Sequence, residues 1–202
     1  MHSMKKTIEL SDPRTLRALA HPTRLALVGL LRQHGTLTAT QAAQLLGLNS
    51  GACSFHLRQL AKYGLVEEVS APGRQKPWRA TAEATSWPAV ATEPEMTAAV
   101  RLLSGVLVER YADIMLSWVD RRPDEPEAWQ RAGWLGDALL HITADELNDL
   151  REQIERLVAP YERRVFEQDS RPAGSRPVSV LQAAIPLNAA GDAEREKGKE
   201  PT

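Results

Sequence analysis

The segment from Ser50 to Tyr63 combines short polar, aromatic and cationic side chains at helical spacing. On a helix, the apolar Cys53, Leu57 and Leu60 share one face, so the polar and cationic side chains occupy the other sides. Arginine can form a bidentate pair with guanine, serine contacts several base edges, and an aromatic ring can meet a thymine methyl. For His56, a structural hydrogen bond is the alternative to a DNA contact. We expect DNA contacts from Ser50, Gly51, Ser54, Phe55, His56, Arg58 and Lys62.

A second group of cations, Arg74, Lys76 and Arg79, lies in or beside a predicted hairpin turn. The flanking residues Leu65–Val69 and Pro77–Thr81 have the composition of short strands, and Pro and Gly between them favour a turn. Cations at such a hairpin suit contact with phosphates, which positions a protein on DNA without recognising its sequence. The alternative is an ordinary charged surface turn.

Three helices are predicted ahead of the segment that begins at Ser50: Pro13–Ala20, Thr23–His34 and Thr38–Leu46. The third begins with a capping box, in which the Thr38 hydroxyl and the Gln41 amide satisfy free backbone N–H groups reciprocally. Only Gly47, Leu48 and Asn49 connect this helix to the next one, so the two must cross at a steep angle. This arrangement is a helix-turn-helix.

The order of these motifs resembles that of winged helix-turn-helix repressors of the ArsR/SmtB type. The resemblance covers about residues 13 to 81 and implies that helix 50–63 enters the major groove, while wing 66–81 touches the DNA backbone or minor groove. Members of this family are usually dimers. The motifs that carry the resemblance are Leu19-Ala20-His21-Pro22-Thr23-Arg24, Phe55-His56-Leu57-Arg58-Gln59-Leu60, Gly64-Leu65-Val66 and Gly73-Arg74.

One departure from the metal-sensing members is clear. They carry a Cys-x-Cys pair in the helix before the recognition helix, or acidic and histidine ligands in the last helix. The segment Thr38–Leu46 contains no cysteine, and the pairs Glu109/Asp113 and Asp137/His141 lack a second histidine nearby. We therefore expect no metal and no cofactor.

Charge and composition narrow the function classes further. Residues 1–80 contain 11 Lys and Arg against 4 Asp and Glu, whereas residues 81–202 contain 14 against 22, so the net charge of −1 hides a basic half and an acidic half. A basic module suits nucleic acid. The single cysteine, Cys53, excludes an intramolecular disulfide and is expected to be a small core residue rather than a redox sensor. Without a signal peptide or membrane-length apolar run, we expect a cytoplasmic protein.

The second half has apolar stripes typical of packed helices. Three helices are predicted, Glu93–Trp118, Ala128–Ile142 and Thr143–Tyr161, with a possible short strand around Val178–Val180. Four tryptophans in this half could line a pocket for a small effector, although filling gaps between helices is the commoner role. The stripe from Met96 to Trp118 is the first candidate for a dimer contact.

These observations predict a mainly α protein, with a winged helix-turn-helix of three to four helices and a two-stranded β wing followed by a helical bundle domain. The predicted domains are residues 1–82 for DNA binding, 83–187 for dimerisation and a possible effector, and 188–202 as a disordered tail. The predicted function is sequence-specific binding of double-stranded DNA by a homodimeric transcriptional repressor. The alternatives are a protein-interaction regulator whose winged domain does not bind DNA, and an enzyme, for which the sequence supplies no catalytic motif.

Overall fold

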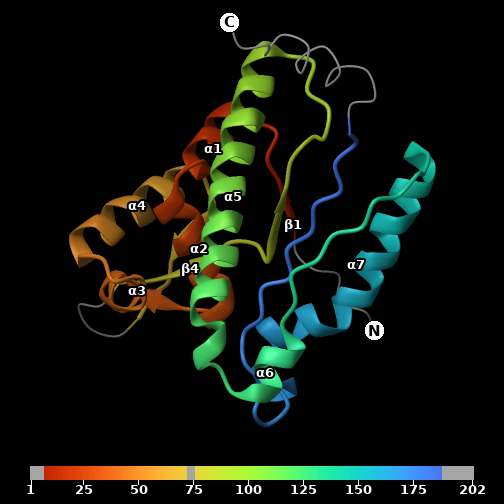
Figure 1. The fold of residues 1–202 in the computed structure, drawn as a ribbon. Helices are drawn as coiled ribbons and strands as arrows, with labels where there is room; N and C mark the ends of the chain where they lie inside the picture. Colours follow the sequence, from red (N-terminus) through yellow and green to blue (C-terminus); the bar gives the residue numbers. More distant parts are fainter. Residues whose placement is uncertain (1–6, 72–75, 188–202) are drawn as a thin grey trace, which may run out of the picture. The chain divides into compact units, whose positions relative to one another are not determined.

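A computed structural model describes residues 7–71 and 76–187, and most of them are helical (Figure 1), as the sequence predicts. Within this part of the chain, the winged helix-turn-helix comes first and long helices follow. The elements in chain order are β1 (Thr7–Glu9), α1 (Pro13–Leu19), α2 (Pro22–His34), β2 (Leu37–Thr38), α3 (Ala39–Leu46), α4 (Ser50–Lys62), β3 (Val66–Glu68), β4 (Pro77–Ala80), β5 (Ala84–Ser86), α5 (Pro94–Arg121), η1 (Arg122–Asp124), α6 (Glu127–Ala132), α7 (Ala144–Phe166) and η2 (Gln168–Ser170).

The two helices of the helix-turn-helix, α3 and α4, and the preceding helix α2 each begin with a side-chain cap. The Nδ1 atom of His21 accepts the Thr23 N–H at 3.1 Å before α2. Before α3, Thr38 and Gln41 form the predicted capping box, and before α4 the Asn49 side chain accepts the Ala52 N–H at 2.7 Å. These caps satisfy backbone donors that lack a partner in the first turn of a helix, so local sequence determines where the three helices begin.

Two small sheets hold the ends of the winged domain together. Strands β2, β4 and β3 form an antiparallel sheet in that order, in which Trp78 lies opposite both Leu37 and Glu68. Strands β1 and β5 form a separate parallel pair, with Thr7 opposite Ala84. This pair is not predicted from the sequence, because each strand is only three residues long and the partners lie far apart in the chain.

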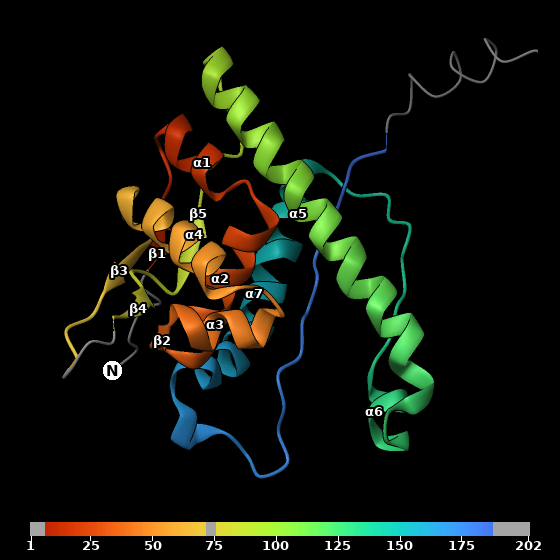
Figure 2. The ribbon, with the colours of Figure 1, turned by 90° about the vertical axis from the view of Figure 1, so that its left-hand side faces the viewer.

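A single hydrophobic core joins the winged domain to the start of α5. Leu16, Leu27 and Leu57 are fully buried, and Ala99 and Leu103 of α5 belong to the same cluster. The relation is visible in Figure 2, where α5 crosses beside α1 and α2. The N-terminal part of α5 is thus fixed to the winged domain by burial of apolar surface.

The predicted helix Ala128–Ile142 is wrong beyond Ala132. Helix α6 ends there, and residues 133–143 form neither helix nor strand. Gly133 has an extended backbone (φ −80°, ψ 134°), and glycine disfavours the interior of a helix. Trp134 and Leu139 are 78% and 73% exposed, so the expected apolar stripe has no surface on which to pack. A helical pattern without a packing partner gains little stability.

The remaining C-terminal predictions have mixed outcomes. Helix α7 runs through Pro160 to Phe166 and contacts α2, so the third predicted helix is confirmed and is somewhat longer than expected. From Ala173 the chain belongs to a second, small unit, whose described residues up to 187 form no helix or strand. The strand expected at Val178–Val180 is therefore wrong, and the predicted tail 188–202 lies outside the described residues.

None of the helices described has the length and apolar character needed to cross a membrane. The predicted domain boundaries after residues 82 and 187 remain predictions.

Candidate nucleic-acid interface

Helix α4 is held by a short turn and by a buried apolar face. Gly47 ends α3 in the left-handed conformation (φ 65°, ψ 29°), and the next residue, Leu48, donates its N–H to the Ala43 carbonyl at 3.0 Å. Cys53, Leu57 and Leu60 of α4 are completely buried in the core. Burial also raises the pKa of the Cys53 thiol, which favours the predicted structural role of this residue. The opposite face of α4 is thereby fixed toward solvent.

The solvent face of α4 presents most of the predicted contact residues. Gly51, Arg58 and Lys62 are exposed, and the Phe55 ring is 51% exposed. Ser50 is exposed in the first turn of the helix. Because α4 contains no acidic residue, this face is cationic with one aromatic ring.

Ser54 is half-buried beside this face and orients one of its cations. The Arg58 guanidinium donates a hydrogen bond from Nη1 to the Ser54 hydroxyl oxygen at 2.7 Å. This contact restricts the Arg58 side chain before any ligand binds, and such restriction lowers the entropic cost of a later bidentate contact.

His56 lies on a flank of α4 that packs against the start of α2. Its ring centroid is 4.6 Å from that of His21, and its Nδ1 atom is buried without a hydrogen-bond partner among the described residues. Burial lowers the pKa of both histidines, and the nearby Arg24 guanidinium lowers both further. At neutral pH this environment favours two uncharged rings in the interface between α2 and α4.

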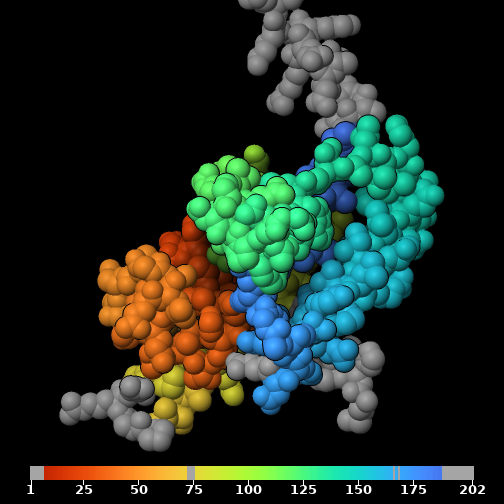
Figure 3. Space-filling view, turned by 60° about the horizontal axis from the view of Figure 1, so that its bottom comes forward, coloured from red at the N-terminus to blue at the C-terminus, as the bar shows by residue number. Residues whose placement is uncertain are grey.

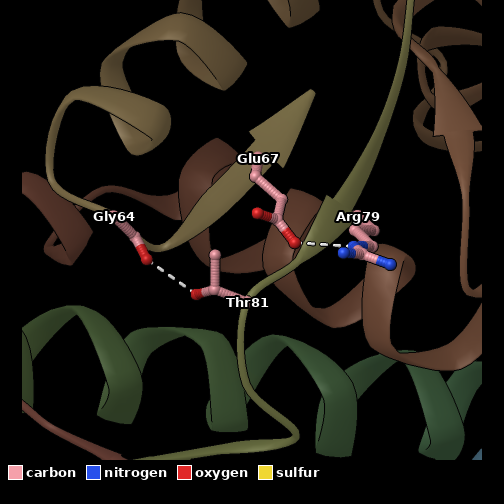
Figure 4. Close-up of polar contacts among 4 residues, drawn as sticks. All are labelled: Gly64, Glu67, Arg79 and Thr81. Atoms are coloured by element: carbon pink, nitrogen blue, oxygen red, sulfur yellow. Dashed lines mark hydrogen bonds and ion pairs between the residues drawn. The ribbon is translucent and has the colours of Figure 1, made fainter. Parts of the chain in front are cut away.

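The wing carries two of the three predicted cations in ion pairs. Arg79 Nε lies 2.6 Å from Glu67 Oε1 across the β3–β4 ladder (Figure 4), and Lys76 Nζ lies 3.1 Å from Glu68 Oε1. Sequence reasoning missed both glutamates, although the hairpin register alone would have placed Glu67 opposite Arg79. The third cation, Arg74, lies outside the described residues.

The base of the wing is tied to the residues just after α4. The Thr81 hydroxyl donates to the Gly64 carbonyl at 2.6 Å, also visible in Figure 4, and the Thr81 N–H donates to the Leu65 carbonyl at 3.2 Å. The hairpin and α4 therefore share a fixed junction, so that a ligand in contact with both would meet a defined geometry.

Helix α5 forms one wall of a cavity of about 520 Å³ beside the helix-turn-helix. Figure 3 shows the green of α5 and the orange of α3 and α4 on either side of a recess. Apolar residues from three elements line the cavity, among them Ala26, Leu46, Leu48, Val106 and Ile114.

The acidic pair Glu109 and Asp113 also lines this cavity, whereas the pair Asp137 and His141 lies in the irregular segment after α6 and loses the helical spacing that suggested it. Across the described ranges, no group of three or more His, Cys, Asp or Glu side chains is placed to hold a metal ion. The aromatic pocket considered for the tryptophans finds no support at Trp134, which is 78% exposed, or at Trp118, which packs on the Gly133 backbone.

One family model and several solved structures match the first half of the chain. Residues 19–69 match the family model described as a helix-turn-helix domain. The homodimeric winged helix-turn-helix DNA-binding domain of Mb0332 from Mycobacterium bovis, described as a possible ArsR-family regulator, is 28% identical over 50% of this chain and 76% of its own, with a TM-score of 0.33. The transcriptional repressor BigR from Xylella fastidiosa is 22% identical over 48% and 83%, with a TM-score of 0.30. A comparison with curated proteins finds no match.

The family match runs from the last residue of α1 to just past β3 and therefore includes the whole of α2, α3 and α4. Together with the order of the elements, it confirms that this part of the chain is similar to a helix-turn-helix domain, as the sequence predicts.

Proposed function

We propose that this chain is a sequence-specific DNA-binding transcription regulator that acts as a homodimeric repressor. The observation that carries the proposal is the solvent face of α4, where Gly51, Phe55, Arg58 and Lys62 are exposed on a helix whose opposite face is buried. In a helix-turn-helix, this second helix lies in the major groove and its exposed residues contact base edges.

The roles of the contact residues follow from their chemistry. Arg58, restrained by Ser54, is suited to a bidentate contact with guanine, and Phe55 to a thymine methyl. Gly51 allows a close approach of the backbone, and Ser50 can bond base or phosphate oxygens. Arg74, Lys76 and Arg79 of the wing, with Lys62, are suited to phosphates.

His56 has a different proposed role. Because its ring lies against the ring of His21, we propose that it positions the recognition helix against α2. This packing role differs both from the DNA contact expected from the sequence and from its alternative, a structural hydrogen bond, since the His56 Nδ1 atom has no hydrogen-bond partner among the described residues.

The stripe expected to make the dimer contact begins with Met96 and Leu103, but both are buried in the core of the winged domain. We therefore propose that dimerisation uses a second apolar face on α5. Val108, Leu116 and Val119 are 65%, 63% and 53% exposed, on the side of the helix opposite the buried Ala99 and Leu103. Two recognition helices on half-sites one helical turn apart give affinity that a single one lacks. A dimer of this kind bound over a promoter would exclude the polymerase, which is the proposed mode of repression.

The cavity beside α5 is the proposed effector site. It lies between the turn of the helix-turn-helix and the proposed dimer helix, so that a bound molecule would change the spacing of the two recognition helices. A ligand that binds there should raise the melting temperature of the unmodified protein. It should not raise that of the Val106→Trp variant, because the larger side chain would fill the cavity.

DNA selection tests the main proposal. A duplex enriched from a random library should bind at least about 10³-fold more tightly than its scrambled version, in fluorescence anisotropy over a range of salt. Arg58→Ala should weaken binding to the enriched duplex by about 1–3 kcal/mol and relax one base position. Arg151→Ala, an exposed change of equal charge on α7, is the control. Absence of any binding at low salt would refute the proposal and favour the protein-interaction alternative.

A further inference from the structure

The wing cations are already paired in the protein without DNA. Arg79 and Glu67 stand directly opposite each other in the β3–β4 ladder, and their side chains are in contact at 2.6 Å. Lys76, just before β4, forms an ion pair with Glu68 of β3, with 3.1 Å between Nζ and Oε1. Each of these two wing cations therefore has a carboxylate where a DNA phosphate would otherwise be its partner.

We propose that Glu67 and Glu68 set the DNA affinity of this protein by competing with phosphates for Arg79 and Lys76. The inference rests on the proposed DNA-binding function and adds two affinity-determining residues to it. Neither glutamate touches DNA in this scheme, and each acts through the cation with which it is paired.

The exposures of the four side chains make such an exchange possible. The side chains of Arg79 and Glu67 are 57% and 47% exposed, and those of Lys76 and Glu68 are 74% and 43% exposed. Exposed ion pairs contribute little to stability, so a phosphate of the DNA backbone can displace the carboxylate at small cost. A buried pair would resist this exchange.

Ion exchange also has a signature in the salt dependence of binding. A cation that neutralises a phosphate releases the counterion condensed on DNA, which adds about 0.9 to the slope of log K against log salt. When Arg79 leaves Glu67, however, the freed carboxylate attracts a cation from solution and cancels part of that release. Removing the carboxylate should therefore steepen the salt dependence as well as tighten binding.

The test compares Glu67→Gln and Glu68→Gln with the unmodified full-length chain on an enriched and a random duplex. The matched control is Glu152→Gln, because Glu152 forms an exposed ion pair with Arg156 at 3.7 Å on α7, away from the wing. At low salt, each wing variant should bind both duplexes about two- to five-fold more tightly, with a salt slope steeper by up to about 0.9. Glu152→Gln should change the DNA affinity and the salt slope less than either wing variant does.

A double-mutant cycle separates exchange from simple repulsion between Glu67 and DNA. If Glu67 acts through Arg79, Glu67→Gln should have no effect on affinity in an Arg79→Ala background. An undiminished effect there, or wing variants that behave like Glu152→Gln, would overturn this inference while leaving the proposed function intact. Absence of DNA binding by the unmodified chain would overturn both.

Discussion

Replacing Gly47 with alanine should destabilise the protein by about 1 kcal/mol, because the residue has a left-handed backbone that costs L-amino acids about 1–2 kcal/mol. Gly47 has φ 65° and ψ 29° at the turn between α3 and α4. A Cβ atom added there would meet no heavy atom within 4 Å, so the cost comes from the backbone alone.

Gly29→Ala is the matched control for this prediction. Gly29 lies inside α2, where an added Cβ would make an ordinary contact of 3.8 Å with the Arg110 side chain. In a helix interior, alanine is favoured over glycine by about 0.5–1 kcal/mol, so the same substitution should stabilise.

Urea unfolding followed by circular dichroism would place the two variants on opposite sides of the unmodified protein, separated by about 1.5–2 kcal/mol. The melting temperatures should differ by about 2–4 °C per kcal/mol for a chain of this size. If both substitutions changed the free energy of unfolding in the same direction, the turn between α3 and α4 would not require a glycine at position 47.

Three further predictions concern capping, titration and packing. Thr38→Ala should cost about 1 kcal/mol in urea unfolding, because it removes the capping box of α3; Thr38→Ser should restore most of it. Since burial lowers the pKa of His21 and His56 below 6.5, the unfolded chain binds protons that the folded protein resists. Stability should therefore be full above pH 6.5 and fall as the pH decreases through the folded-state pKa values; a flat profile from pH 8 to 5 would contradict this, and His56→Gln should flatten it. Gly133→Ala would place a Cβ against the Trp118 ring, so it should cost about 1–3 kcal/mol and alter the near-ultraviolet circular dichroism, whereas Gly136→Ala, with open space around it, should do neither.

The winged domain was largely predictable because its signals are local. The capping box at Thr38, the turn at Gly47 and the Asn49 cap specify helix ends through atoms only a few residues apart. The apolar spacing in α4 likewise determined which of its faces is buried. The order of the elements and the apolar and polar faces of α4 follow from these signals.

Predictions that depended on apolar periodicity alone had different outcomes in different segments. The stripe that begins at Met96 became helix because Ala99 and Leu103 pack on the winged core. The stripe around Leu139 has the same spacing, but the chain leaves the helix at Gly133, whose backbone is extended, and Leu139 stays exposed. The spacing of apolar residues shows which side of a segment could be buried, whereas the tertiary structure decides whether another element packs against that side.

By itself, the sequence determined that this protein has a helix-turn-helix whose second helix has a cationic exposed face, since residue type and local spacing suffice for that. The tertiary structure decided the state of the individual site residues. It turned His56 toward His21, placed Ser54 beneath Arg58, and paired Arg79 with Glu67 across the hairpin. The physical reason is that the pKa of a histidine and the availability of a cation depend on neighbours from other elements, which are brought together only when the chain folds.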